Sequence, residues 1–109
     1  MNANTENPDK YAAERMPVYR FRLFVAGDEP NSQKARAVLA RLCDTHLKDR
    51  YEMQIVDVFE NYQAAIDHGV IVVPTLIVES PPPVKTIVGS LADEQKVLAL
   101  LGLAEKGGR

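Results

Sequence analysis

Hydrophobic and polar positions change period along the chain, and the first half of the pattern predicts a strand, a helix and a second strand. Residues 18–25 (VYRFRLFV) and 51–59 (YEMQIVDVF) alternate apolar and polar side chains and are rich in aromatic and β-branched types, which favours strands. Over 32–48 the apolar residues instead recur at helical spacing, with Leu39 and Leu42 on one side and Arg41 on the other. This order implies a parallel pair of strands joined by a right-handed crossover.

The second half predicts a short helix, two strands and a last helix. Asn61 can cap a brief helix that runs to about His68, with Gly69 ending it in the left-handed conformation. The run VIVVPTLIVES is apolar at nearly every position and predicts a buried strand that starts near Pro74. A proline-stiffened turn and a further strand (PPPVKTIVG) complete a hairpin, and SLADEQKVLALLGL predicts a helix with Ser90 as its N-cap.

The junction between the first strand and the first helix, LFVAGDEPNSQKARAVL, is where small α/β proteins often place chemistry. Free backbone N–H groups and the positive end of the helix dipole meet there. No residue of this junction is an obvious catalyst. We interpret Asn31 as the N-cap of the helix, with Ser32 as a second candidate.

Length, composition and charge narrow the class of protein. The 109 residues suit one domain, which we expect over 18–105, with a flexible extension at 1–17 and a flexible tail at 106–109. A net charge of −2 argues against nucleic acid as the main partner, because binding to phosphates needs clustered lysines and arginines. No apolar run has the length of a membrane span or of an export signal, so we expect a cytoplasmic protein without membrane contact.

The candidate reactive side chains are few. Cys43 is the single cysteine, so no internal disulfide can form, and its place on the apolar side of the first helix favours a buried thiol over a reactive one. His46 and His68 have no ligand-like spacing, and we expect neither a metal nor a cofactor. Asp57 ends the second strand and is either a structural acid or one that faces the junction.

The element order βαβαββα, with a central mixed sheet, resembles the thioredoxin-like fold. The junction lies where thioredoxins carry a CxxC motif at a helix N-terminus, and VVPT resembles the segment in which a cis-proline faces the active site. The resemblance implies a cis bond between Val73 and Pro74. It also leaves an alternative function open, a thioredoxin-fold oxidoreductase or thiol-dependent enzyme. The missing CxxC argues against that alternative, because thiol–disulfide exchange needs a thiolate at the helix N-terminus.

A closer resemblance covers residues 18–101. The segments LFVAGDEPNSQKA, IVDV, VPTLI, PPPVKTIVG and EQKVL stand in the order and at the spacing of the circadian clock protein KaiB family. The match is specific because VAGxxPNS and PxPVxxIxG are joined in one short chain. The same module is similar to the N-terminal sensor domain of the clock-output histidine kinase SasA.

The resemblance implies regulation by binding, without catalysis. KaiB-like proteins bind the ring-shaped ATPase KaiC, and the complex captures KaiA. They also switch fold: a tetrameric ground state rearranges the second half, and a thioredoxin-like monomer is the binding form. A homo-oligomer, dimer or tetramer, is therefore expected among the states of this chain. The segment that would switch contains Pro74, Pro81, Pro82, Pro83 and Gly89.

The chain departs from the clock pattern at several positions. Clock members read Gly, Leu, Asp where this chain has Leu100, Leu101 and Gly102, and leucine at the first place favours the last helix by about 0.5–1 kcal/mol. We expect Gly102 to offset part of this gain, and we expect a stronger lean towards the thioredoxin-like form than in clock members. At two positions in the second and third strands where clock members carry basic residues, this chain has Gln54 and Val78, which argues against a KaiA-like partner.

Two lysines match places where family members carry basic residues. Lys34 lies in the first turn of the first helix, and Lys85 follows the PPP turn. Both are candidates for contact with a KaiC-like ATPase.

Overall fold

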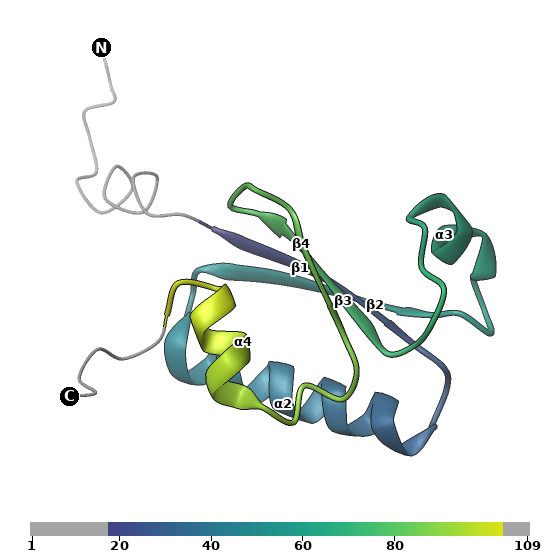
Figure 1. Ribbon diagram of the computed structural model, residues 1–109, viewed down its shortest axis with the longest axis horizontal. Helices are drawn as coiled ribbons and strands as arrows, with labels where there is room; N and C mark the ends of the chain where they lie inside the picture. Colours follow the sequence, from purple (N-terminus) through teal and green to yellow (C-terminus); the bar gives the residue numbers. More distant parts are fainter. Residues whose placement is uncertain (1–17, 104–109) are drawn as a thin grey trace, which may run out of the picture.

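The chain forms its strands and helices in the order βαβαββα that the sequence predicts (Figure 1). The computed structural model describes residues 18–103, and the expected extension at 1–17 and tail at 106–109 lie outside these residues. Numbered as in Figure 1, the elements are β1 (Tyr19–Val25), α2 (Pro30–His46), β2 (Tyr51–Asp57), α3 (Tyr62–Asp67), β3 (Thr75–Ser80), β4 (Lys85–Val88) and α4 (Glu94–Leu100).

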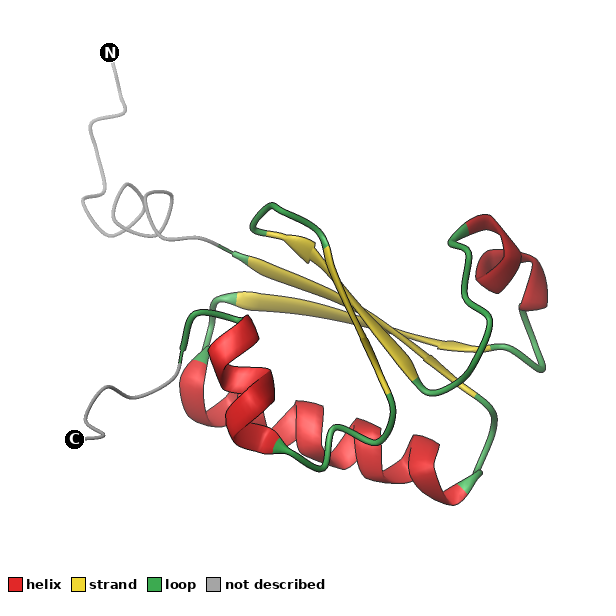
Figure 2. Ribbon diagram, viewed as in Figure 1, coloured by secondary structure: helices red, strands yellow, loops and turns green. Residues whose placement is uncertain are grey.

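The four strands form one mixed sheet in the order β2-β1-β3-β4 (Figure 2). β1 pairs in parallel with β2, as the crossover through α2 requires, and Leu23 lies opposite Ile55. On its other side β1 pairs antiparallel with β3, and β3 continues into the antiparallel hairpin with β4. β2 and β4 are therefore the two edges of the sheet.

The helices cover the two faces of the sheet unequally. α2 and α4 lie side by side under one face (Figure 1), where alternate strand residues such as Leu23 and Leu76 join Leu39 and Val97 in the main core. α3 serves the other face near the end where β1 and β2 finish, over a small cluster of Phe24, Val56, Ala65 and Ile77. The second face is thus only partly covered.

Both N-caps that we assigned to the flanking helices at Asn31 and Ser90 are wrong. α2 begins at Pro30, and the side chain of Glu29 accepts a hydrogen bond from the Ser32 N–H. Proline suits the first helical position because it has no N–H to satisfy and a helical φ, so the helix starts at Pro30, two residues earlier than an N-cap at Asn31 would allow.

At α4 the N-cap is Asp93, whose carboxylate accepts from the Lys96 N–H at 3.2 Å. The chain between Ser90 and this cap is not helical, because Leu91 takes a positive φ of 64° with its side chain buried in the core. The cap of α3, Asn61, is as predicted.

Two glycines end helices in the left-handed conformation. After α3, Gly69 has φ 69° and Val70 donates to the Ala65 carbonyl, as predicted for Gly69. After α4, Gly102 has φ 75°, its N–H bonds the Ala99 carbonyl, and the next N–H bonds the Leu98 carbonyl. This is a Schellman motif, so Gly102 terminates α4. Our expectation that Gly102 would weaken this helix is therefore wrong.

The prolines frame the C-terminal hairpin. Pro74 is buried directly before β3, and the Val73–Pro74 bond is cis, as the resemblance implied. The Ser80–Pro81 and Pro82–Pro83 bonds in the turn before β4 are also cis. Gly89 follows β4 with φ 111° and donates to the Pro74 carbonyl, so the two ends of the hairpin are held together.

Candidate functional site

The junction between β1 and α2 is built from backbone hydrogen bonds to three side chains. The Glu29 carboxylate caps α2, and hydrogen bonds from the backbone N–H groups of Asn31 and Ser32 hold its pKa below the usual value of 4.5. The Ala26 N–H donates to Oγ of the buried Ser32. Asp57 accepts from the N–H of Gly27 at 3.1 Å and of Phe59 at 3.0 Å, so its carboxylate both faces the junction and holds the loops there in place.

The single thiol of the chain does not have the properties that the alternative function would need. Cys43 is fully buried on the inner side of α2, and burial, assisted by the charge of Asp44, raises the pKa of its thiol to about 12. A thiol with that pKa is protonated at neutral pH and is a poor nucleophile. Within residues 18–103, no three His, Cys, Asp or Glu side chains gather as a metal ion would require.

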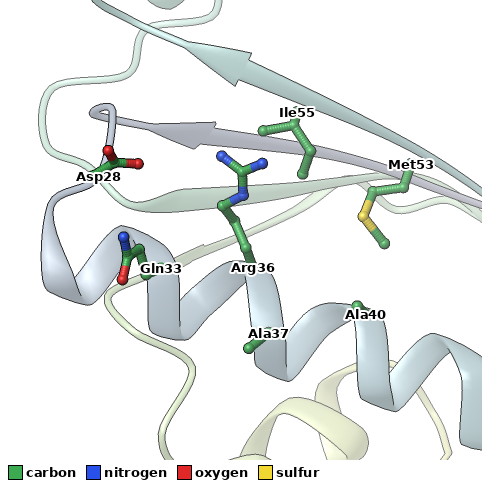
Figure 3. A pocket seen from close by; sticks show the side chains of 7 residues that line it. All are labelled: Asp28, Gln33, Arg36, Ala37, Ala40, Met53 and Ile55. Atoms are coloured by element: carbon green, nitrogen blue, oxygen red, sulfur yellow. The ribbon is translucent and has the colours of Figure 1, made fainter.

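A groove of about 570 Å³ runs between α2 and the edge strand β2 (Figure 3). Ala37, Ala40, Met53 and Ile55 line its apolar part. Arg36 extends from α2 into the groove and Asp28 lies at the end near the start of the helix (Figure 3). In the described part of the chain, Arg36 forms no ion pair, so its charge is available to a partner.

The structure places Lys34 and Lys85 at opposite ends of the sheet. Lys34 is exposed in the first turns of α2, next to the end of β1. Lys85 is half-buried at the start of β4 and lies opposite Val78, which in turn lies opposite Phe21 near the start of β1. The two lysines therefore do not form one compact site, and a single partner that touches both must extend along the whole domain.

Sequence reasoning missed a polar network on the less covered face of the sheet. Arg22 donates to Glu79 at 2.6 Å and to Gln54 at 2.8 Å, and the hydrogen bond from Arg22 lowers the pKa of the Glu79 carboxyl. The His68 ring packs against the Phe24 ring at an angle of 52° between the ring planes, and its Nε2 is 3.9 Å from Glu79. Gln54 is thus engaged with Arg22, whereas Val78 faces the core with 1% of its surface exposed.

Comparison with known proteins identifies the family. The model of the KaiB domain matches residues 22–103, which contain every helix and nearly every strand described above. The chain belongs to the KaiB family. Circadian clock protein KaiB3 of Synechocystis sp. is 38% identical over 86 residues, covering 79% of this chain and 84% of that protein. The circadian clock oscillator protein KaiB of Picosynechococcus sp. is 40% identical over 85 residues, covering 78% and 82%.

Solved structures place this KaiB-family chain in the thioredoxin-like fold. The N-terminal domain of Synechococcus elongatus SasA superposes with a TM-score of 0.64 at 18% identity, over 79% of this chain and 82% of that domain. Fasciola hepatica thioredoxin superposes with a TM-score of 0.65 at 18% identity, over 90% and 91%. The described residues contain no helix long and apolar enough to cross a membrane.

Proposed function

We propose that this KaiB-family protein is a non-enzymatic regulator that binds a KaiC-type ATPase ring in a circadian clock, a simpler timer or a stress response. The observation that carries the proposal is the KaiB domain match over residues 22–103. The buried Cys43, with a thiol pKa of about 12, adds support because it leaves the thiol-dependent alternative without a nucleophile at the junction. We place this activity in the cytoplasm and assign it to a domain spanning 18–105.

The contacts that we propose for the ATPase include Lys34 and Lys85. Both bear positive charge outside the main core, and their separation along the domain suits the broad surface of a ring subunit better than a short peptide. The groove between α2 and β2 adds Arg36, which forms no ion pair with any of residues 18–103. We expect no KaiA-like partner, because Gln54 is bonded to Arg22 and Val78 is buried.

Size-exclusion chromatography with multi-angle light scattering tests the proposal. The protein is run alone, which reports monomer, dimer or tetramer, and then with the KaiC-type ATPase of the same organism. We expect the two proteins to elute together as a complex larger than the ATPase ring. Separate elution at all nucleotide states of the ATPase would contradict the proposal.

Charge reversal tests the contact residues. Lys34→Glu and Lys85→Glu should each weaken the complex about tenfold or more, because an attractive pair becomes a repulsive one. Lys96→Glu is the matched control, since Lys96 is exposed on α4. Equal affinity for all three variants would remove Lys34 and Lys85 from the interface while leaving the proposed function in place.

A further inference from the structure

The exposed apolar side chains of the described residues are concentrated in one segment. We define the α3 lobe as residues 58–73, which comprise the loop after β2, α3 and the loop before β3. Of the nine large hydrophobic residues that are exposed in the described chain, five belong to this lobe. They are Phe59 (77%), Tyr62 (65%), Ile66 (53%), Ile71 (93%) and Val72 (49%). Apolar exposure on this scale in one place marks an interaction surface.

The apolar surface continues from α3 to the edge of the sheet. Tyr62 and Ile66 lie one turn apart on α3, and both side chains are exposed while Ala65 beside them is buried. Ile71 and Val72 then line a groove of about 370 Å³, whose opposite wall includes Val88 of the edge strand β4. Figure 1 shows α3 standing apart from α2 and α4, so neither of those helices covers this surface.

The α3 lobe carries negative charge and contains no lysine or arginine. No lysine or arginine occurs from residue 51 to residue 84. Glu60 and Asp67 are exposed, and Asp67 accepts only an amide hydrogen bond, from Gln63 at 2.9 Å. Among residues 18–103 neither carboxylate forms an ion pair, in contrast to Glu79, which is paired with Arg22.

We propose that the α3 lobe is a docking surface for a basic amphipathic helix of a partner protein. The groove beside Ile71 and Val88 takes the apolar side chains of that helix, and Glu60 and Asp67 attract the lysines or arginines that flank them. An anionic membrane does not fit the lobe, because its head groups would be repelled by the same carboxylates. The proposal is independent of the ATPase and of Lys34 and Lys85.

A synthetic peptide of fourteen residues, with leucine and lysine at amphipathic helical spacing, is the probe. It is titrated into the full chain labelled with ¹⁵N, and amide shifts are followed by NMR. We expect the shifts to map to residues 58–73 and to β4. The same peptide with glutamate in place of every lysine should bind at least tenfold more weakly.

Matched variants separate the lobe from general adhesion. Ile71→Ser and Asp67→Lys should each weaken the lysine peptide about tenfold, since one removes an exposed apolar contact and the other reverses a charge. Val84→Ser and Asp44→Lys make the same chemical changes outside the lobe and should leave the affinity unchanged. The proposal is overturned if the shifts map to α2, if all four variants bind alike, or if the protein sediments with phosphatidylserine vesicles.

Discussion

Glu29 joins the loop after β1 to the start of α2, and its carboxylate lies at the positive end of the helix. Because the folded pKa of this carboxyl lies below its usual value of 4.5, the ionised form stabilises the native state. That contribution is present above the unfolded pKa and is lost as the pH falls through the folded pKa.

Replacing this cap should lower the thermal stability of the protein. Glu29→Ala leaves the Ser32 N–H without its side-chain acceptor, so its Tm should fall at neutral pH. Asn31→Ala is the matched control, because Asn31 caps nothing, and its Tm should stay near that of the parent. In thermal melts below a pH of 4.5 the difference between Glu29→Ala and the parent should shrink. A larger loss for Asn31→Ala than for Glu29→Ala would contradict this assignment.

The Cys43 thiol should be unreactive in the native protein. Its sulfur is fully buried and its pKa is raised to about 12, so both access and ionisation oppose attack on a reagent. We expect Ellman's reagent to release no colour from the folded chain at about pH 8, and one thiol equivalent after denaturation in guanidinium. Rapid reaction of the folded protein would return the thiol-dependent alternative to consideration.

At the scale of elements, the end of α4 is set by Leu98 to Leu103 rather than by helix propensity alone. The Schellman hydrogen bonds close the helix, and the Tyr19 hydroxyl donates to the Leu101 carbonyl at 3.0 Å. This links the last turn of α4 to the first residue of β1. The stability of α4 therefore depends on both its own residues and its contact with the sheet.

Substitutions at Leu100 and Gly102, two positions that depart from the clock pattern, should both lower the stability of the protein, but for different physical reasons. Leu100→Gly adds a flexible residue to the last helical position and should cost about 0.5–1 kcal/mol. Gly102→Ala should cost about 1 kcal/mol, because alanine is strained at a φ of 75°. A Cβ at this position would meet no atom within 4 Å, so the cost comes from the backbone alone and not from a steric clash. Gly102→Asn is the control, since asparagine tolerates this conformation. Urea unfolding measures all three, and an unchanged midpoint for Gly102→Ala would rule out the termination role.

The sequence predicts the elements well because each hydrophobic period is kept over a long run of residues. Leu39 and Leu42 repeat at helical spacing, and the alternation in residues 51–59 identifies β2 even though the strand stops at Asp57. Helix starts are harder because several polar residues compete for one cap. Asn31 has the better intrinsic preference, but Pro30 fixes the first helical position and leaves Glu29 in the cap.

The candidate site was less predictable, since it depends on which residues the topology brings together. Lys34 and Lys85 both follow from family motifs, yet only the register of the strand pairs shows that they lie at opposite ends of the sheet. The network of Arg22, Gln54 and Glu79 joins three strands, and no local pattern connects residues so far apart in the chain. The α3 lobe had a sequence signal, the absence of lysine and arginine from 51 to 84.

For the whole molecule, we predict that the thioredoxin-like arrangement dominates in solution, more so than in clock members. Leu100 and the glycine termination at Gly102 both favour α4, which belongs to this arrangement. Backbone chemical shifts should report strands at 75–80 and 85–88 and a helix at 94–100. Leu100→Gly should raise the population of any second arrangement. A dominant tetramer with a rearranged C-terminal half would show the prediction to be wrong.

Within the sheet, β1 is the strand through which the two halves of the chain pair. β1 and β2 pair with each other, and within the sheet the later elements join them only where β3 pairs with β1 from Arg20 to Phe24. A register irregularity between Arg20 and Phe21 already interrupts this ladder. Because the β1–β2 ladder contains no residue of the C-terminal half, we predict that any rearrangement of that half leaves this ladder intact and instead breaks the β1–β3 ladder and the packing of α4 on α2.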